Sequence, residues 1–318
     1  MASIVKELCA FLDGPPTALV EVVSAKGSTP REKGAWMLVS PLRIFGTIGG
    51  GQLEFMAIDK AREMLRSPSL LWGRSASGLS AAKFESRGGG PPEKATPTPD
   101  LRSDPPHKGE GERLSIPLGP EIGQCCGGRV ELSIRLVDAA LEARLLKAAA
   151  AEEARLPHVY VFGGGHVGHA LASAFSLLPL KTIVVETRAD ALEGMPASVE
   201  TRLTPVPEEM VRDAPAGSAF VVLTHDHALD FLIVAESLRR DDAAYVGMIG
   251  SKTKKATFRN WYLKTAGGSE RSFSRLVSPI GGDAVKDKRP AVIAALAAAE
   301  IMTALATATA RGHVMQQA

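Results

Sequence analysis

The chain is poor in cysteine, in aromatic side chains and in net charge. It has 3 cysteines among 318 residues, 5% aromatic residues and a formal net charge of +2. Three cysteines cannot build a disulfide framework, and their scarcity is typical of proteins from a reducing compartment. A nearly neutral chain also lacks the concentrated basic face of a general nucleic-acid binder. We therefore expect a protein that does not bind nucleic acid.

Long uncharged apolar runs are also scarce. Lys6 and Glu7 interrupt the apolar residues near the N-terminus, unlike the uncharged core of a secretory signal. The most apolar stretch, 291–310, consists mainly of alanine and threonine and carries Glu300 in its middle. Because Pro290 suits the first turn of a helix, we predict a soluble helix there rather than a membrane span. The expected location is the cytoplasm, away from membranes.

The length and the 45% apolar content allow two domains of ordinary size. In the first, 1–138, apolar runs at 18–23 and 35–40 predict strands, and the residue spacing over 52–65 predicts a helix. The following stretch, 67–112, is rich in glycine, proline, serine and charge. Such a composition cannot bury enough apolar surface to order a chain, so it predicts a disordered insert.

An alanine-rich segment with interspersed charges, 139–157, predicts a helical linker to a second domain, 158–318. There a buried strand over 158–162 leads into a glycine turn and a helical pattern, and strands and helices alternate from then on. This alternation predicts a parallel sheet with helices on both faces. The expected fold class is α/β, with a small mixed α+β domain followed by a Rossmann-like domain.

The glycine turn of the second domain matches a dinucleotide-binding pattern. Gly163, Gly165 and Gly168 have the spacing of that pattern, and Glu186 ends the next strand. Dinucleotide folds place there the carboxylate that holds ribose hydroxyls. One interpretation is a nucleotide bound in this domain. The other is a Rossmann-like architecture whose nucleotide site has been lost.

A second glycine cluster precedes the helix of the first domain. Amides at a helix start carry partial positive charge, so Gly49, Gly50 and Gly51 could cradle a phosphate. The alternative is a glycine-rich turn required only for packing. Arg31 has a similar pair of interpretations, because it could clamp an anion or lie on a turn without a ligand.

Two short polar segments follow later strands of the second domain. His225 and Asp226 come directly after one strand, and Ser251 and Lys252 follow the next. These positions face the ligand-binding edge of an open parallel sheet. We expect Asp226 and Ser251 to cap helices, His225 to hydrogen-bond a ligand, and Lys252 to reach a phosphate or remain solvated. A metal site on His225 and His227 is the less favoured alternative.

The two remaining cysteines are adjacent and flanked by glycines. Cys125 and Cys126 would form only a strained disulfide with each other. Their thiolates favour a soft metal or a metal that already carries sulfur. The alternative is that both are small buried residues at the start of a strand. The whole segment reads Gly123-Gln124-Cys125-Cys126-Gly127-Gly128.

No residues indicate hydride transfer or an activated serine or cysteine nucleophile, which favours a binding protein over an enzyme. Several segments together resemble the XdhC/CoxI family of accessory proteins. They are residues 18–23 with 27–31, 46–51 with Glu54, 123–128, 162–168, 224–226, 250–252, 279–282 and the helix around 298–300.

The resemblance implies a chaperone of the molybdenum cofactor, molybdopterin. Such a protein binds the cofactor transiently and shields it while a cysteine desulfurase supplies the terminal sulfur. It then inserts the cofactor into the molybdenum subunit of apo xanthine dehydrogenase or of a related hydroxylase. Family resemblance also implies an N-terminal XdhC/CoxI domain, a C-terminal Rossmann domain and a homodimer.

The resemblance also assigns residues. Cys125 or Cys126 would contact the molybdenum, the glycines of both clusters would shape the pocket, and the turn at 163–168 would receive a phosphate. No residue is predicted to be catalytic. The predicted cofactor-binding residues are Arg31, Gly49, Gly50, Gly51, Gln124, Cys125, Cys126, Gly127, Gly128, Gly163, Gly165, Gly168, Glu186, His225, Ser251 and Lys252.

Two features depart from the family pattern: the insert at 67–112, and the sequence of 281–285, which lacks the glycine-and-threonine-proline form of many relatives. Two rival functions stay open. One is an NAD(P)-dependent oxidoreductase that uses the Rossmann-like domain. The other is a scaffold that recruits the desulfurase to the dehydrogenase without binding cofactor.

Overall fold

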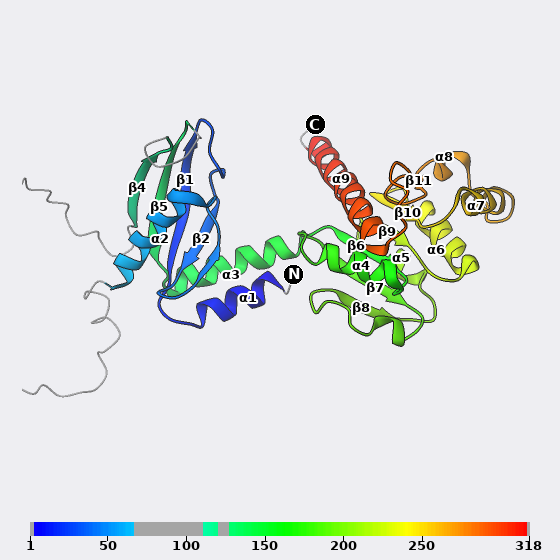
Figure 1. Cartoon of the computed structure of the whole chain (residues 1–318), viewed down its shortest axis with the longest axis horizontal. Helices are drawn as coiled ribbons and strands as arrows, with labels where there is room; N and C mark the ends of the chain where they lie inside the picture. The colour runs from blue at the N-terminus through cyan, green and yellow to red at the C-terminus, as the bar shows by residue number, and fades with distance from the viewer. Residues whose placement is uncertain (1–2, 67–110, 120–126, 317–318) are drawn as a thin grey trace, which may run out of the picture. The chain divides into compact units, whose positions relative to one another are not determined.

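The computed structural model describes residues 3–66, 111–119 and 127–316, and the chain forms two compact units (Figure 1). One unit comprises Lys6–Ala148, and the other comprises Met1–Val5 with Ala149–Ala318. The division falls inside α1 (Ile4–Leu12) and α3 (Ala139–Glu153). The predicted insert, 67–112, lies outside the described residues except for its last two. Its predicted end is wrong by one residue, because Glu112 is the first residue of a strand and pairs with Ile134.

The unit Lys6–Ala148 contains a five-stranded antiparallel sheet, as its short alternating apolar runs predict. Helix α2 (Gly51–Arg66) covers one face with Leu53, Ala57 and Ala61, which are fully buried among the strand side chains. This is the mixed first domain that the sequence predicts. In spatial order the strands are β3 (Ile44–Gly46), β2 (Trp36–Val39), β1 (Ala18–Lys26), β5 (Arg129–Leu136) and β4 (Glu112–Pro117).

The other unit contains a six-stranded sheet whose strands all pair in parallel. If β6 is counted as strand 1, the spatial order of the strands is the Rossmann order 3-2-1-4-5-6. The strands are therefore added outward on one side of β6 and then, from β9 on, outward on its other side, while all remain parallel. The predicted fold class is therefore confirmed. The strands are, in spatial order, β11 (Leu276–Val277), β10 (Tyr245–Met248), β9 (Ala219–Val222), β6 (His158–Phe162), β7 (Lys181–Glu186) and β8 (Glu200–Leu203).

Helices lie on both faces of this sheet, which forms two apolar clusters. On one face, α4 (His166–Phe175) packs beside α9 (Pro290–Gln316) against β6 and β9 (Figure 1). The opposite face packs against α6 and α7. The remaining helices of this unit are η3 (Asp190–Leu192), α5 (Glu209–Arg212), α6 (His227–Arg239), α7 (Lys252–Lys264) and α8 (Glu270–Phe273).

Helix α9 is the apolar stretch for which a packed helix was predicted. Among the described helices, its segment Pro290–Ala310 is long and apolar enough to cross a membrane, by length and composition alone. Ile301 and Leu305 are buried in the core cluster with α4, as the sequence suggested. The Tyr245 hydroxyl donates a hydrogen bond to the Glu300 carboxylate, and burial together with this bond raises the pKa of Tyr245. The charge in the middle of α9 thus has a partner in the sheet.

Candidate functional site

Three loops of the unit Lys6–Ala148 meet at one end of the antiparallel sheet. A Cβ atom placed on Gly128 would lie 2.4 Å from the Ser28 carbonyl oxygen, and one placed on Gly49 would lie 2.6 Å from Cβ of Pro30. The same Cβ on Gly49 would lie 3.2 Å from Cγ of Arg31. The structure therefore brings the predicted residues Arg31, Gly49 and Gly128 together, and contacts this close explain both glycines.

The glycine turn before α2 already holds a carboxylate. Oε2 of Glu54 accepts hydrogen bonds from the Thr47 hydroxyl at 2.6 Å, the Ile48 amide at 3.2 Å and the Gly50 amide at 3.0 Å. The Gly49 amide donates to Oγ1 of Thr47 at 3.1 Å. Of the amides that the sequence offered to a phosphate, that of Gly50 thus donates to a carboxylate of the chain itself, and that of Gly49 donates to a hydroxyl. Glu54 itself is partly exposed.

The predicted residues Gln124, Cys125 and Cys126 lie outside the described residues, and so their contacts are not assigned. Gly127 and Gly128, which follow them directly, do belong to the loop cluster. The Gly128 carbonyl accepts the Leu118 amide at 2.7 Å.

In the Rossmann-like unit, the glycine turn forms as predicted between β6 and α4. Gly163 has a φ of +117°, and a Cβ placed on it would lie 2.7 Å from the Leu223 carbonyl oxygen. A Cβ placed on Gly168 would lie 2.0 Å from the Gly163 carbonyl oxygen. Packing of strand and helix therefore accounts for both glycines. Gly165, the N-cap of α4, is exposed and has no atom within 4 Å of such a Cβ.

Glu186 lies at the end of β7, beside this turn, as predicted. Its Oε2 accepts the Gly164 amide at 2.8 Å, and its Oε1 accepts the Thr187 amide at 2.8 Å and the Arg188 amide at 3.2 Å. Burial raises the pKa of the Glu186 carboxyl, but these amides outweigh that effect and hold the pKa below its ordinary value. The carboxylate is therefore charged and bonded to the backbone.

The polar segments after β9 and β10 cap helices. Asp226 accepts the Ala228 amide at 2.7 Å as the N-cap of α6, and Ser251 accepts the Lys254 amide at 3.2 Å as the N-cap of α7. Both predicted caps are confirmed.

The other polar residues of these segments point to solvent. His225 and His227 are exposed, and Nζ of Lys252 lies 4.0 Å from Oδ2 of Asp283 on an exposed surface. Within the part of the chain that the structure describes, no cluster of three or more histidine, cysteine or acidic side chains could hold a metal.

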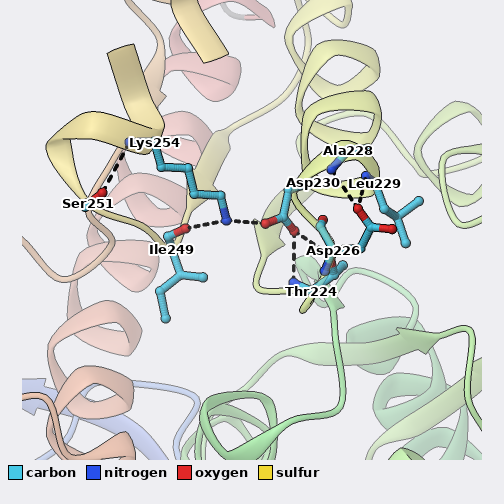
Figure 2. Close-up of polar contacts among 8 residues, drawn as sticks. All are labelled: Thr224, Asp226, Ala228, Leu229, Asp230, Ile249, Ser251 and Lys254. Carbon is cyan, nitrogen blue, oxygen red and sulfur yellow. Dashed lines mark hydrogen bonds and ion pairs between the residues drawn. The ribbon is translucent and has the colours of Figure 1, made fainter. Parts of the chain in front are cut away.

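Sequence reasoning missed a buried ion pair at this edge of the sheet. Figure 2 shows Lys254 of α7 pointing at Asp230 of α6, with its Nζ also donating to the Ile249 carbonyl at 3.1 Å. Oδ1 of Asp230 accepts the amide of Thr224 at 3.0 Å and its hydroxyl at 2.7 Å. Asp230 is fully buried and the Lys254 side chain is 9% exposed. The pair links the loop after β9 to the loop after β10. In the sequence, only the alternation of strands and helices indicates that these two loops lie at the same edge of the sheet.

A groove of about 470 Å³ lies over β6, β7 and β8, away from every predicted site residue. Three of its charged side chains are paired, since Glu200 lies between Lys181 and Arg202, and the exposed Asp213 lines the groove as well. Burial, followed by the neighbouring Lys181, lowers the pKa of His158 at its floor.

Family models and known proteins are similar to this chain in sequence. Residues 159–301 match the XdhC Rossmann domain, and residues 11–71 match the XdhC and CoxI family. The chain is 23% identical over 298 residues to the uncharacterized protein YqeB of Escherichia coli strain K12. That alignment covers 90% of this chain and 43% of YqeB, so the chain spans less than half of that relative.

A solved structure supports the fold independently. A crystal structure described as a xanthine dehydrogenase from Bacillus halodurans superposes with a TM-score of 0.69 at 15% identity, covering 96% of both chains. At this identity the likeness concerns the fold alone. The family matches fall on the first part of the antiparallel-sheet unit and on the Rossmann-like unit, and together they place this chain in the XdhC and CoxI family.

Proposed function

We propose that this protein is an accessory protein that binds the molybdenum cofactor, shields it during sulfuration and inserts it into apo xanthine dehydrogenase or a related molybdenum hydroxylase. The observation that carries the proposal is the loop cluster of the unit Lys6–Ala148. There Arg31, Gly49 and Gly128 come together, and in the sequence Gly128 follows Cys125 and Cys126 after a single glycine. Family membership supports a role in the maturation of xanthine dehydrogenase.

The chemistry of the cluster suits this cargo. Molybdopterin carries a phosphate, which an arginine and helix-start amides can hold. Its molybdenum and dithiolene sulfurs are soft and therefore compatible with cysteine thiols. Glu54 accepts the Gly50 amide at a partly exposed turn, and we propose that the cargo phosphate exchanges with this carboxylate.

The proposal assigns this chain a binding role and leaves catalysis to its partners. A cysteine desulfurase would supply sulfur, and the molybdenum subunit of the dehydrogenase would receive the cofactor. We extend the proposal to a homodimer located in the cytoplasm.

The test is the pterin and molybdenum content of the full chain, purified anaerobically from a strain that makes the cofactor. We expect near-stoichiometric pterin in the wild type and, if affinity falls at least about tenfold without the thiols, clearly substoichiometric pterin in a Cys125→Ala, Cys126→Ala variant. A Cys9→Ala variant is the matched control, because Cys9 lies on α1. Absence of pterin from the wild type, where a known binder is loaded, would refute the proposal.

A further inference from the structure

The Rossmann-like unit carries the glycine pattern of a dinucleotide site, yet most of that pattern is explained by contacts within the chain. Gly163 and Gly168 are required by the packing of β6, α4 and Leu223. Gly164 is required as well, since a Cβ placed there would lie 2.3 Å from the Ala191 carbonyl oxygen. Three of the four glycines at the turn are therefore required by packing and are not evidence for a bound ligand.

The segment after β7 reaches this turn and is held in three ways. Thr187 and Arg188 bond to Glu186 through their amides. The Ala191 carbonyl oxygen lies 3.2 Å from Nε2 of His169 on α4. Leu192, at the end of η3, packs against the apolar cluster below α4. A segment with these anchors is part of the domain core and does not behave as a lid.

Glu186 is the residue that would have to bind the ribose. A ribose-binding carboxylate at the end of the second strand presents its oxygens to the ligand hydroxyls. Here the side chain is 5% exposed, and its two oxygens accept three backbone amides as well as the Thr187 hydroxyl at 3.2 Å. The donors that would compete with ribose belong to the same chain and are held by the fold.

We infer that the Rossmann-like unit fills the ribose side of its own nucleotide crevice with the Glu186 carboxylate and the Ala191 carbonyl, and therefore binds no nicotinamide or flavin dinucleotide there. The inference goes beyond the proposed function and does not depend on it. Cargo binding concerns the thiols of the other unit and is decided separately by pterin content.

The first experiment is a titration of the full chain with NADH and NADPH, followed by nicotinamide fluorescence, with a known Rossmann dehydrogenase measured alongside. We expect no saturable change up to about 1 mM nucleotide. Saturable binding of either nucleotide to this chain overturns the inference. Such binding would also support the alternative hypothesis of an NAD(P)-dependent oxidoreductase.

A second measurement does not depend on a negative titration. Amide hydrogen exchange at Gly164 and Thr187 should be slow without nucleotide and change by less than about twofold when NADH is added. Glu186→Gln should accelerate exchange at both amides by at least about tenfold, since the charged acceptor is lost. Gly165→Ala is the matched control and should leave both rates unchanged. Fast exchange that NADH slows would overturn the inference.

Discussion

Two glycine turns of this chain each donate backbone hydrogen bonds to a glutamate carboxylate. The two glutamates differ in how far along the sequence they lie from the turn. The turn before α2 binds Glu54, which stands four residues after Gly50 in the helix that the turn opens. The turn after β6 binds Glu186 across 22 residues, from the neighbouring strand. Glu54 is partly exposed, whereas Glu186 is buried. The amides at a helix start favour an anion in both places.

This difference in burial and sequence separation suggests that a ligand can replace the carboxylate at the first turn but not at the second. A carboxylate supplied by the next helical turn costs the fold little to release, because its removal leaves the strands in place. A buried carboxylate that joins two strands cannot leave without exposing unsatisfied amides in the domain interior. We therefore expect ligand chemistry at the first turn and architecture at the second.

Asp230 is a third carboxylate that holds a turn, and breaking its pairing should have the largest effect. In Lys254→Met, Asp230 keeps its charge in a fully buried position and loses its cation. Removing one partner of a buried pair typically costs about 3–5 kcal/mol. Denaturant unfolding of the full chain, followed on the Rossmann-like unit, measures this loss. An Asp230→Asn, Lys254→Met double variant should recover most of it. A wild-type midpoint in Lys254→Met would show that the pair does not hold the loops.

Glu186→Gln tests whether the second turn depends on charge. The variant weakens bonds from three amides to an ionised acceptor, so we expect a loss of about 2–3 kcal/mol at neutral pH. The pKa of Glu186 is lowered in the folded state, so its contribution is present above the unfolded pKa, near 4.5, and is lost as pH falls through the folded pKa. Thermal midpoints from pH 7 to pH 3 should therefore converge for wild type and variant below pH 4.5. A constant difference would contradict this account.

Neighbouring glycines sharpen the same comparison. Gly164→Ala places a methyl group against the Ala191 backbone and should cost about 1–3 kcal/mol. Gly165→Ala meets open space, and its φ of −72° suits any residue, so it should change stability by less than about 0.5 kcal/mol. Both are measured by thermal unfolding. Equal effects would mean that η3 does not press on the turn.

Among the carboxylate variants, Glu54→Gln should have the smallest effect on stability. Its hydrogen bonds lie at a partly exposed turn, and water can replace the carboxylate, so we expect a loss of about 0.5–1 kcal/mol. Thermal unfolding of the unit Lys6–Ala148 provides the measurement, and Glu63→Gln on the exposed side of α2 is the control. A loss as large as that of Glu186→Gln would remove the distinction between the two turns.

Much of the fold follows from local sequence patterns. The alternation of apolar runs and helical spacings predicts β6, α4, β7, β9, α6, β10 and α7 to within a few residues. It misses the short elements β8, α5 and β11, whose few residues carry no period of their own and are set by pairing or packing with longer neighbours. Strand β1 extends to Lys26, beyond its apolar run, because it pairs with Arg129 of β5.

The sequence by itself determined the features that depend on neighbours along the chain. Asp226 and Ser251 cap the helices that follow them, and glycine occupies the positions of positive φ at Gly49 and Gly163. Helix caps and positive φ angles depend on hydrogen bonds and steric limits between residues only a few positions apart, so a short stretch of sequence is enough to predict them.

Only the tertiary structure decided which groups meet across the chain. The sequence placed Glu186 near the turn and suggested ribose, but strand pairing delivers it to the Gly164 amide instead. It gave no sign that Lys254 would reach Asp230, or that Gly128 would close on Ser28. Such contacts depend on strand order and register, which are fixed by burying the sheet faces together, so no local pattern can specify them.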